Sequence, residues 1–383
     1  MKKNRKRGKT QWLVMLCYTL IGAACGVLIM TYLDRLPGEL FSADKLILLA
    51  VLFLCMYGAI LVQIIIHEAG HLVFGLATGY RFSSFRIFSL MWLKENGKIR
   101  FSRMSVAGTG GQCLMSPPDL KDGKMPVMLY NFGGALLNLF AALVFGGIML
   151  LCPAWSLIWL VLLFLVITGV AFALINGFPL GTGPVNNDGR NALDLSRSPE
   201  AVKAFWIQMK VNEMISRGIR VRDMPEEWFE MPSDEAMQNG IIATLGVLAC
   251  NRLMDEKRFA DAERLMAHIL SNETGVVGLH RILLTCDRMY VELIGPNRAE
   301  VLKGMLSKEQ KKIMKAMKQY PSVLRTEYAY ALLCEKDTEK AGSIRKHFEK
   351  AAETYPYPGE ICAERELMVL AAEKSGLENY SSI

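Results

Sequence analysis

The sequence predicts a mostly α-helical membrane protein, with four transmembrane helices, a small cytoplasmic β-hairpin insertion and an all-α soluble domain after them. Hydrophobic residues make up 52% of the 383 residues, and four apolar stretches are long enough, at about 1.5 Å per residue, to cross about 30 Å of hydrocarbon. Charged residues nevertheless reach 21% and are concentrated after residue 189, which a purely transmembrane chain would not show. We therefore expect a transmembrane domain over residues 1–190 and a cytoplasmic helical domain over residues 191–383.

The four expected spans cover residues 12–32, 46–78, 127–151 and 154–175. The first span is longer than the apolar region of a cleavable signal peptide, and no small-residue cleavage site leads from it into a soluble chain. We expect this span to remain as a membrane anchor. The second span begins with an uncharged stretch, residues 46–66, and continues through a motif of ionisable residues.

The distribution of lysine and arginine predicts how these spans are oriented. The segment between the first two spans offers only Arg35 and Lys45, whereas two other segments are strongly basic. Because cytoplasmic loops carry an excess of basic residues, we expect a multi-pass protein of the cell membrane with both termini in the cytoplasm. The basic residues are Lys2, Lys3, Arg5, Lys6, Arg7 and Lys9 at the N-terminus, and Arg81, Arg86, Lys94, Lys98, Arg100, Arg103, Lys121 and Lys124 in the loop at residues 80–125.

The second span ends in an H-E-x-x-H motif at residues 67–71. On a helix, positions i and i+4 share a face, so His67 and His71 can bind one Zn²⁺ while Glu68 reaches a metal-activated water. The alternative is two incidental histidines in a long apolar helix. Ionisable groups at membrane depth are costly and mark functional sites by default, which favours the metal site.

A third metal ligand is expected from Asp188. It is the only acidic residue between residues 154 and 190, and it follows the fourth span directly. The predicted orientation brings the ends of the second and fourth spans to the same side of the membrane. The alternative is a solvated turn residue in an Asn-Asp-Gly loop. Three protein ligands leave a fourth position for water, which is typical of catalytic zinc.

These residues resemble the motifs of the site-2 protease family of intramembrane zinc metallopeptidases, over residues 46–190. Asn176 and Pro179, followed by Asp188, look like the family's Asn-x-x-Pro…Asp-Gly element, whose aspartate completes the zinc site. Gly134 to Asn138 looks like its Gly-Pro-x-x-Asn element, whose asparagine helps to hold the substrate. The resemblance implies Zn²⁺ bound by both motif histidines and the aspartate, with the motif glutamate and the asparagine as catalytic residues.

The sequence departs from the family pattern at two points. Nine positions separate Pro179 from Asp188, which is more than is usual in the family, and Ala135 stands where the family has proline. The extra residues either loop out harmlessly or displace Asp188 from the zinc site. Asn138 itself has two interpretations: a donor that orients the substrate carbonyl, or a partner in a hydrogen bond between helices beside small residues.

Residues 80–125 are predicted to contain a β-hairpin. Asn96 and Gly97 lie between extended-favouring residues, which is a strong hairpin signal. In the family this region resembles a membrane-associated β-element, and an open strand edge could hold an unwound substrate by β-addition. An amphipathic hairpin resting on the lipid surface is an equal alternative, because the loop is both basic and rich in apolar residues such as Phe88 and Trp92.

The residues after 191 are predicted to form amphipathic helices. Ser198 and Pro199 are typical of a helix start, and Gly218 is typical of the position just past a helix end. Helix pairs joined by short charged turns suggest a tetratricopeptide-like solenoid, and a plain helical bundle is equally compatible. The pairs are residues 241–253 with 259–270, and residues 322–335 with 339–354. Either fold would serve as a partner-binding module without chemistry of its own.

The leading hypothesis is an intramembrane zinc metalloprotease that acts in regulated intramembrane proteolysis. Its substrate would be a membrane-anchored protein or peptide, cut within or next to the membrane segment. The alternative is a catalytically inactive membrane scaffold of the same fold that recruits a protein partner through its helical domain. Nine scattered cysteines without a C-x-x-C pair fit a reducing cytoplasm. The net charge of +7 comes largely from the segments expected to face the lipid bilayer, so no nucleic-acid partner is expected.

Overall fold

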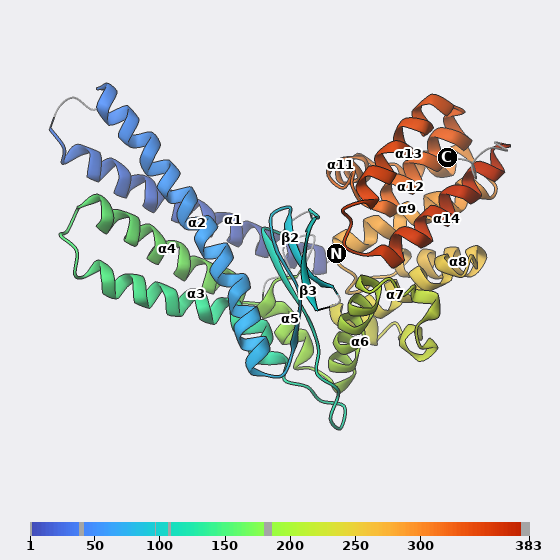
Figure 1. Cartoon of the computed structure of the whole chain (residues 1–383), viewed down its shortest axis with the longest axis horizontal. Coiled ribbons are helices and arrows are strands. Elements are labelled where there is room, and N and C mark those ends of the chain that lie inside the picture. Colours follow the sequence, from blue (N-terminus) through green and yellow to red (C-terminus); the bar gives the residue numbers. More distant parts are fainter. Residues whose placement is uncertain (1, 38–41, 96, 106–108, 180–185, 377–383) are drawn as a thin grey trace. The chain divides into compact units, whose positions relative to one another are not determined.

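The computed structural model describes residues 2–37, 42–95, 97–105, 109–179 and 186–376. The chain is mostly helical, at 70%, with three candidate membrane helices and one small antiparallel sheet. It divides into two compact units (Figure 1): Met1–Tyr80 with Pro126–Leu193, and Arg81–Met125 with Asp194–Ile383. The sequence analysis grouped the loop at residues 80–125 with the transmembrane part, whereas the structure groups its strands with the helices that follow.

Three helices of the first unit are long and apolar enough to cross a membrane. They are α2 (Ala43–Ala77), α3 (Val127–Met149) and α4 (Leu157–Gly177). Only 22–28% of the most apolar window of each helix is buried inside the protein, so most of these side chains face outward, as lipid-facing residues do. The first expected span lies within α1 (Lys2–Asp34), where the apolar helix found among the described residues is the shorter Thr19–Asp34. The basic side chains before residue 10 lie outside the described part of the chain.

Glycine lets α2 and α3 approach each other closely. A Cβ added at Gly70 would lie 2.2 Å from the carbonyl oxygen of Gly133, and one added at Gly133 would lie 2.6 Å from that of Gly70. Small residues that permit such backbone contact are typical of helix packing in membranes. This contact holds the last turns of α2, which carry the H-E-x-x-H motif, against the first turns of α3.

The expected hairpin is part of a four-stranded antiparallel sheet with the strand order β3-β2-β1-β4. The strands are β1 (Arg81–Ile87), β2 (Leu90–Glu95), β3 (Lys98–Arg103) and β4 (Gly111–Ser116). Asn96 lies outside the described residues, while Gly97 has the positive φ of +80° that such a turn requires. One face of the sheet is buried at Met91 and Leu93, and the other exposes Trp92 and Phe101.

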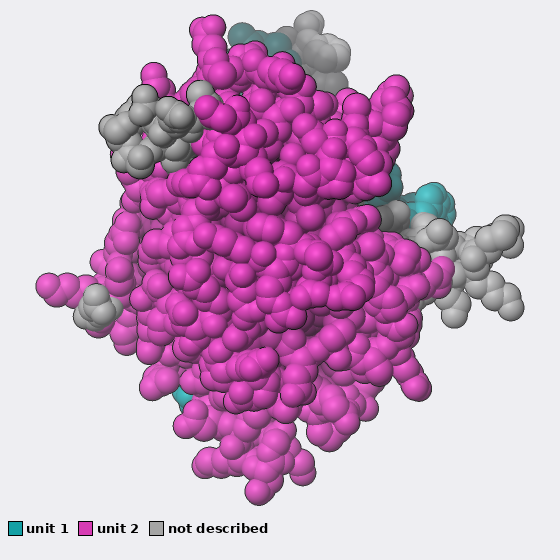
Figure 2. Space-filling model, turned by 90° about the vertical axis from the view of Figure 1, so that its right-hand side faces the viewer, with its two compact units in different colours: residues 1–80, 126–193 teal, residues 81–125, 194–383 magenta. Residues whose placement is uncertain are grey.

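Helices make up the rest of the second unit, one face of which is seen in Figure 2. Ser198 caps α6 by accepting a hydrogen bond from the Ala201 backbone N–H at 3.2 Å, and Pro199 opens the helix, as the sequence predicted. The helices are α6 (Pro199–Ser216), α7 (Gly240–Asp255), α8 (Phe259–Ser271), α9 (Gly278–Ile294), α10 (Ala299–Met305), α11 (Lys308–Ala316), α12 (Pro321–Tyr330), α13 (Thr338–Ala352) and α14 (Pro358–Lys374). Side chains from α7, α8, α9, α12, α13 and α14 form one apolar core.

The sheet packs onto these helices within the second unit. The Trp206 indole N–H of α6 donates to the backbone carbonyl of Pro118 at 3.0 Å, just after β4. At the other edge, the Ser102 hydroxyl of β3 donates to the backbone carbonyl of Thr354. Arg100 of β3 adds a second hydrogen bond there, from its Nη2 to the backbone carbonyl of Glu353 at 3.3 Å, so both sides of the sheet are attached to the helices.

Candidate metal centre

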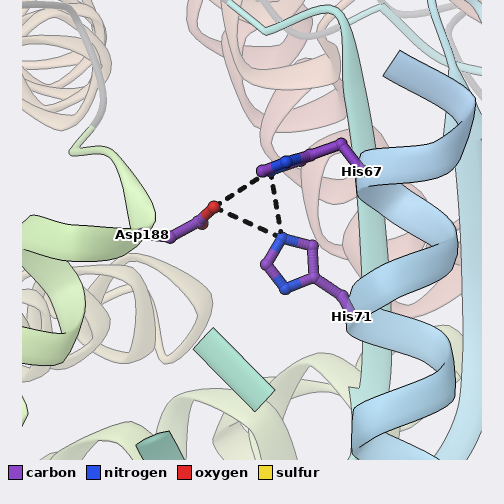
Figure 3. A group of neighbouring side chains, drawn as sticks. All are labelled: His67, His71 and Asp188. Atoms are coloured by element: carbon purple, nitrogen blue, oxygen red, sulfur yellow. Dashed lines mark hydrogen bonds and ion pairs between the residues drawn. The ribbon is translucent and has the colours of Figure 1, made fainter. Parts of the chain in front are cut away.

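His67 and His71 lie on one face of α2 and point to a common centre (Figure 3). Their Nε2 atoms are 3.3 Å apart, and each residue is 7% exposed. The i, i+4 spacing of the motif produces this geometry, because residues four apart lie one above the other on an α-helix. Glu68, between them in the sequence, is also 7% exposed. The structure thus brings the motif into the interior of the first unit.

Asp188, the first residue of α5 (Asp188–Leu195), faces both histidines from the other side (Figure 3). Its Oδ2 atom lies 3.0 Å from His67 Nε2 and 3.4 Å from His71 Nε2. This oxygen is buried, and apart from the two histidine nitrogens it has no hydrogen-bond partner among the described residues. A buried carboxylate oxygen without such a partner is costly unless a cation fills the gap.

Asn187 fixes the start of α5 against the end of α4. Its amide group donates to the carbonyl oxygens of Ile175 and Phe178, both at 2.6 Å, and its Oδ1 accepts from the Arg190 backbone N–H at 2.9 Å. Residues 180–185, which carry the extra spacing after Pro179, lie outside the described part of the chain. The anchor at Asn187 places Asp188 beside α2 whatever path those residues take. From the sequence alone, no role in metal binding was expected for Asn187.

Hydrogen bonds behind the two rings set their tautomers. His67 Nδ1–H donates to Asn138 Oδ1 at 2.8 Å, and His71 Nδ1–H donates to the Tyr130 carbonyl at 2.7 Å. With the proton on Nδ1, each Nε2 keeps its lone pair for the centre. A histidine that ligates a metal is commonly held in this way by a partner on its other nitrogen.

Asn138 is completely buried and belongs to a chain of hydrogen bonds across three helices. Its amide group donates to the backbone oxygen of Gln63 at 2.9 Å and to Gln63 Oε1 at 2.7 Å. Gln63 Nε2 in turn donates to the Leu165 carbonyl of α4 at 2.8 Å. Both amide hydrogens of Asn138 are thereby used, and its oxygen holds His67. This arrangement favours the interhelical interpretation of Asn138 over a direct contact with substrate.

Two further residues of the site escaped the sequence analysis or were only partly understood there. Gln63 precedes His67 by four positions in an otherwise apolar stretch, and this isolated polar residue on the same helix face was the available signal. Gly134 had been noted only as a small residue of a weak motif. A Cβ added there would lie 2.5–2.7 Å from three atoms of the His67 ring, so only glycine leaves room for the ring in this position.

The three ligand atoms match the spacing of a tetrahedral zinc site. Zinc binds nitrogen and oxygen at about 2.0–2.1 Å, which separates two corners of a tetrahedron by about 3.3–3.4 Å. The observed separations among Asp188 Oδ2, His67 Nε2 and His71 Nε2 are 3.0, 3.3 and 3.4 Å. These residues therefore fit a divalent metal such as Zn²⁺.

Comparisons with known protein families, curated proteins and solved structures gave no match to this chain.

Proposed function

We propose that this protein is an intramembrane zinc metalloendopeptidase, similar to the site-2 protease family, that cuts a peptide bond within or next to the membrane segment of its substrate. The observation that carries the proposal is the convergence of His67, His71 and Asp188 at tetrahedral spacing beside helices apolar enough to cross a membrane. A structural zinc site would use four protein ligands, whereas three leave a position for water.

The chain's own residues divide the chemical work among them. Zn²⁺, when bound, lowers the pKa of a water molecule and polarises the scissile carbonyl. His67, His71 and Asp188 would hold the metal, and Asn138 would keep His67 oriented. Glu68 would accept the proton of the attacking water and pass it to the leaving amine. A helical substrate would have to unwind locally, since its carbonyl groups are otherwise engaged in the helix.

We further propose the finer membrane arrangement that the sequence predicts: α1 as a fourth span, both termini in the cytoplasm, and the sheet on the cytoplasmic side. The exposed sheet face supports contact with either lipid or substrate. Trp92 and Phe101 lie side by side on it, with ring centroids 6.0 Å apart, and Ile99 is 58% exposed on β3. The helices of the second unit are compatible with a tetratricopeptide-like solenoid or a bundle.

The test compares the full-length wild type with Glu68→Gln in the same cells. Metal analysis of the purified proteins should find zinc in both, because Glu68 is not a ligand. N-terminal peptide profiling of the membrane fraction should find new cleavage sites in or next to transmembrane segments only with the wild type. Equal cleavage by both proteins would refute the mechanism. Zinc without any cleavage by the wild type would favour the inactive scaffold.

A further inference from the structure

The second unit contains a cleft of about 350 Å³ between the faces of four helices. Each of these helices contributes a pair of polar residues that are four or seven positions apart, and so share a helix face; Thr244 of α7 and Ser322 of α12 also line the cleft. The pairs are Gln208 and Asn212 on α6, Asn251 and Asp255 on α7, His280 and Asp287 on α9, and Glu360 and Glu364 on α14. All of the lining residues belong to the second unit, so the cleft is independent of the metal centre.

The charges around this cleft do not balance. Four carboxylates line it, and no lysine or arginine does so among the described residues. Arg325, which is completely buried, forms ion pairs with two of them. Its Nε donates to Glu364 at 2.8 Å, and its Nη2 donates to Asp287. Asp255 pairs with Arg220. The partner of Glu360 is the neutral Tyr355 hydroxyl, which donates a hydrogen bond to it at 3.0 Å.

Glu360 is consequently a carboxyl group that lacks a cation within the part of the chain that is described. Burial, and next the neighbouring Glu364, raise the pKa of Glu360 to about 8. Asp287 acts in the same direction, while the Tyr355 hydroxyl and Arg325 oppose the rise. A cation entering the cleft would stabilise the ionised form of this group.

The cleft also offers hydrogen-bonding groups that the protein leaves unused. Asn212 and Asn251 are exposed, and their side chains make no hydrogen bond to the rest of the described chain. The Nδ1 atom of His280 is buried and has no partner there either. Burial lowers the pKa of His280 to about 4, so the ring is neutral and presents one donor and one acceptor. Asparagine amides likewise offer a donor and an acceptor, which is what a peptide backbone requires.

We propose that this cleft binds a basic peptide segment. A lysine or arginine side chain would be seated between Glu360, Glu364 and Asp287, and the peptide backbone would pair with Asn212 and Asn251. The volume lies within the range of about 300–1,000 Å³ for small-ligand sites, and it accommodates a side chain with its flanking peptide groups. The apolar lining, which includes Leu283 and Leu284, would contact the methylene groups of the basic side chain.

Binding should depend on pH, because the seated cation requires Glu360 to be ionised. Below pH 8 the free protein holds a proton on Glu360, and binding must release it. The affinity should therefore fall as the pH is lowered from 9 to 6, at most about tenfold for each pH unit. A lysine side chain stays charged over this range. The other titratable or charged groups around the site are Glu364, Asp287, Asp255, Arg325, Arg220, His280, Tyr355, Tyr357 and Tyr320.

The experiment uses the full-length protein in detergent and fluorescent, end-blocked pentapeptides of alanine with a central lysine, norleucine or glutamate. Fluorescence anisotropy should show binding of the lysine peptide, and at least tenfold weaker binding of the other two. Glu360→Gln and Asn251→Ala should each weaken the lysine peptide at least fivefold, and Glu360→Gln should remove the pH dependence. Glu373→Gln changes an exposed carboxylate on the same helix, α14, and should have no effect.

Several results would overturn the proposal. They are undetectable binding of the lysine peptide at millimolar concentration, equal binding of the norleucine peptide, or unchanged binding in both cleft variants. Spermidine binding as tightly as the lysine peptide would identify a site for small polycations instead. Because Asn251 is exposed, Asn251→Ala should fold even if Glu360→Gln does not.

Discussion

Gly134→Ala should disturb the metal centre although Gly134 is not a ligand. The new Cβ would lie 2.5 Å from His67 Cε1, 2.6 Å from Nδ1 and 2.7 Å from Nε2, whereas ordinary contacts begin at 3.4 Å. The ring would have to move by about 0.9 Å to relieve the closest of these contacts. The ring has contacts on two sides that such a movement would disturb. Its Nδ1 lies 2.8 Å from Asn138 Oδ1, and its Nε2 lies 3.0 Å from Asp188 Oδ2.

A movement of this size exceeds what a metal site tolerates. Ligand distances are normally kept within about 0.2 Å, and loss of a partner behind a ligand typically costs 10- to 100-fold in metal affinity or activity. We therefore expect Gly134→Ala to weaken zinc binding by roughly 10- to 100-fold, and to lower activity at limiting zinc. Chelator competition on the purified protein measures the affinity.

Gly147→Ala is the matched control. Gly147 lies on the same helix, α3, and a Cβ added there meets nothing within 4 Å. Both substitutions favour the helix by roughly the same 1 kcal/mol, so a difference between them isolates the contact with His67. Size-exclusion chromatography and circular dichroism should show both variants folded. Zinc affinity equal to the wild type in Gly134→Ala would refute the assignment of His67 Nε2 as a ligand in this position.

Four further outcomes are expected. Asp188→Ala should no longer bind one equivalent of zinc at limiting metal. The control Asp223→Ala, which changes a side chain that is 60% exposed, should bind zinc as the wild type does. One equivalent of zinc in both variants would mean that another residue is the third ligand. Asn187→Ala should lower zinc affinity about tenfold by releasing the start of α5. Asn138→Leu should lower zinc affinity roughly 10- to 100-fold, whereas a residue that contacted only substrate would change KM and leave zinc binding intact. Residues 191–383 should be digested by added protease only after the membrane is permeabilised, and digestion from outside intact cells would contradict the topology.

The sequence by itself determined the features that depend on local spacing. The i, i+4 histidines share a helix face in any α-helix, and the length and composition of α2, α3 and α4 mark them as candidate spans. The Ser198 cap and the strands on either side of Gly97 are equally local. The first span stays a prediction, because the apolar helix found in α1 is shorter than the other three.

The tertiary structure decided what depends on approach between distant segments. Asp188 meets the histidines of α2 because Asn187 is anchored to the end of α4, and Gly134 is required only once α3 lies against His67. The sheet likewise needs β4, which pairs with β1 although β2 and β3 lie between them in the sequence. In the second unit, each acidic residue such as Glu360 has the sequence pattern of a solvated position on its own helix. Only the packing of the helices brings these residues together around one cleft. Side-chain periodicity fixes the face of a helix, but packing alone chooses its neighbour.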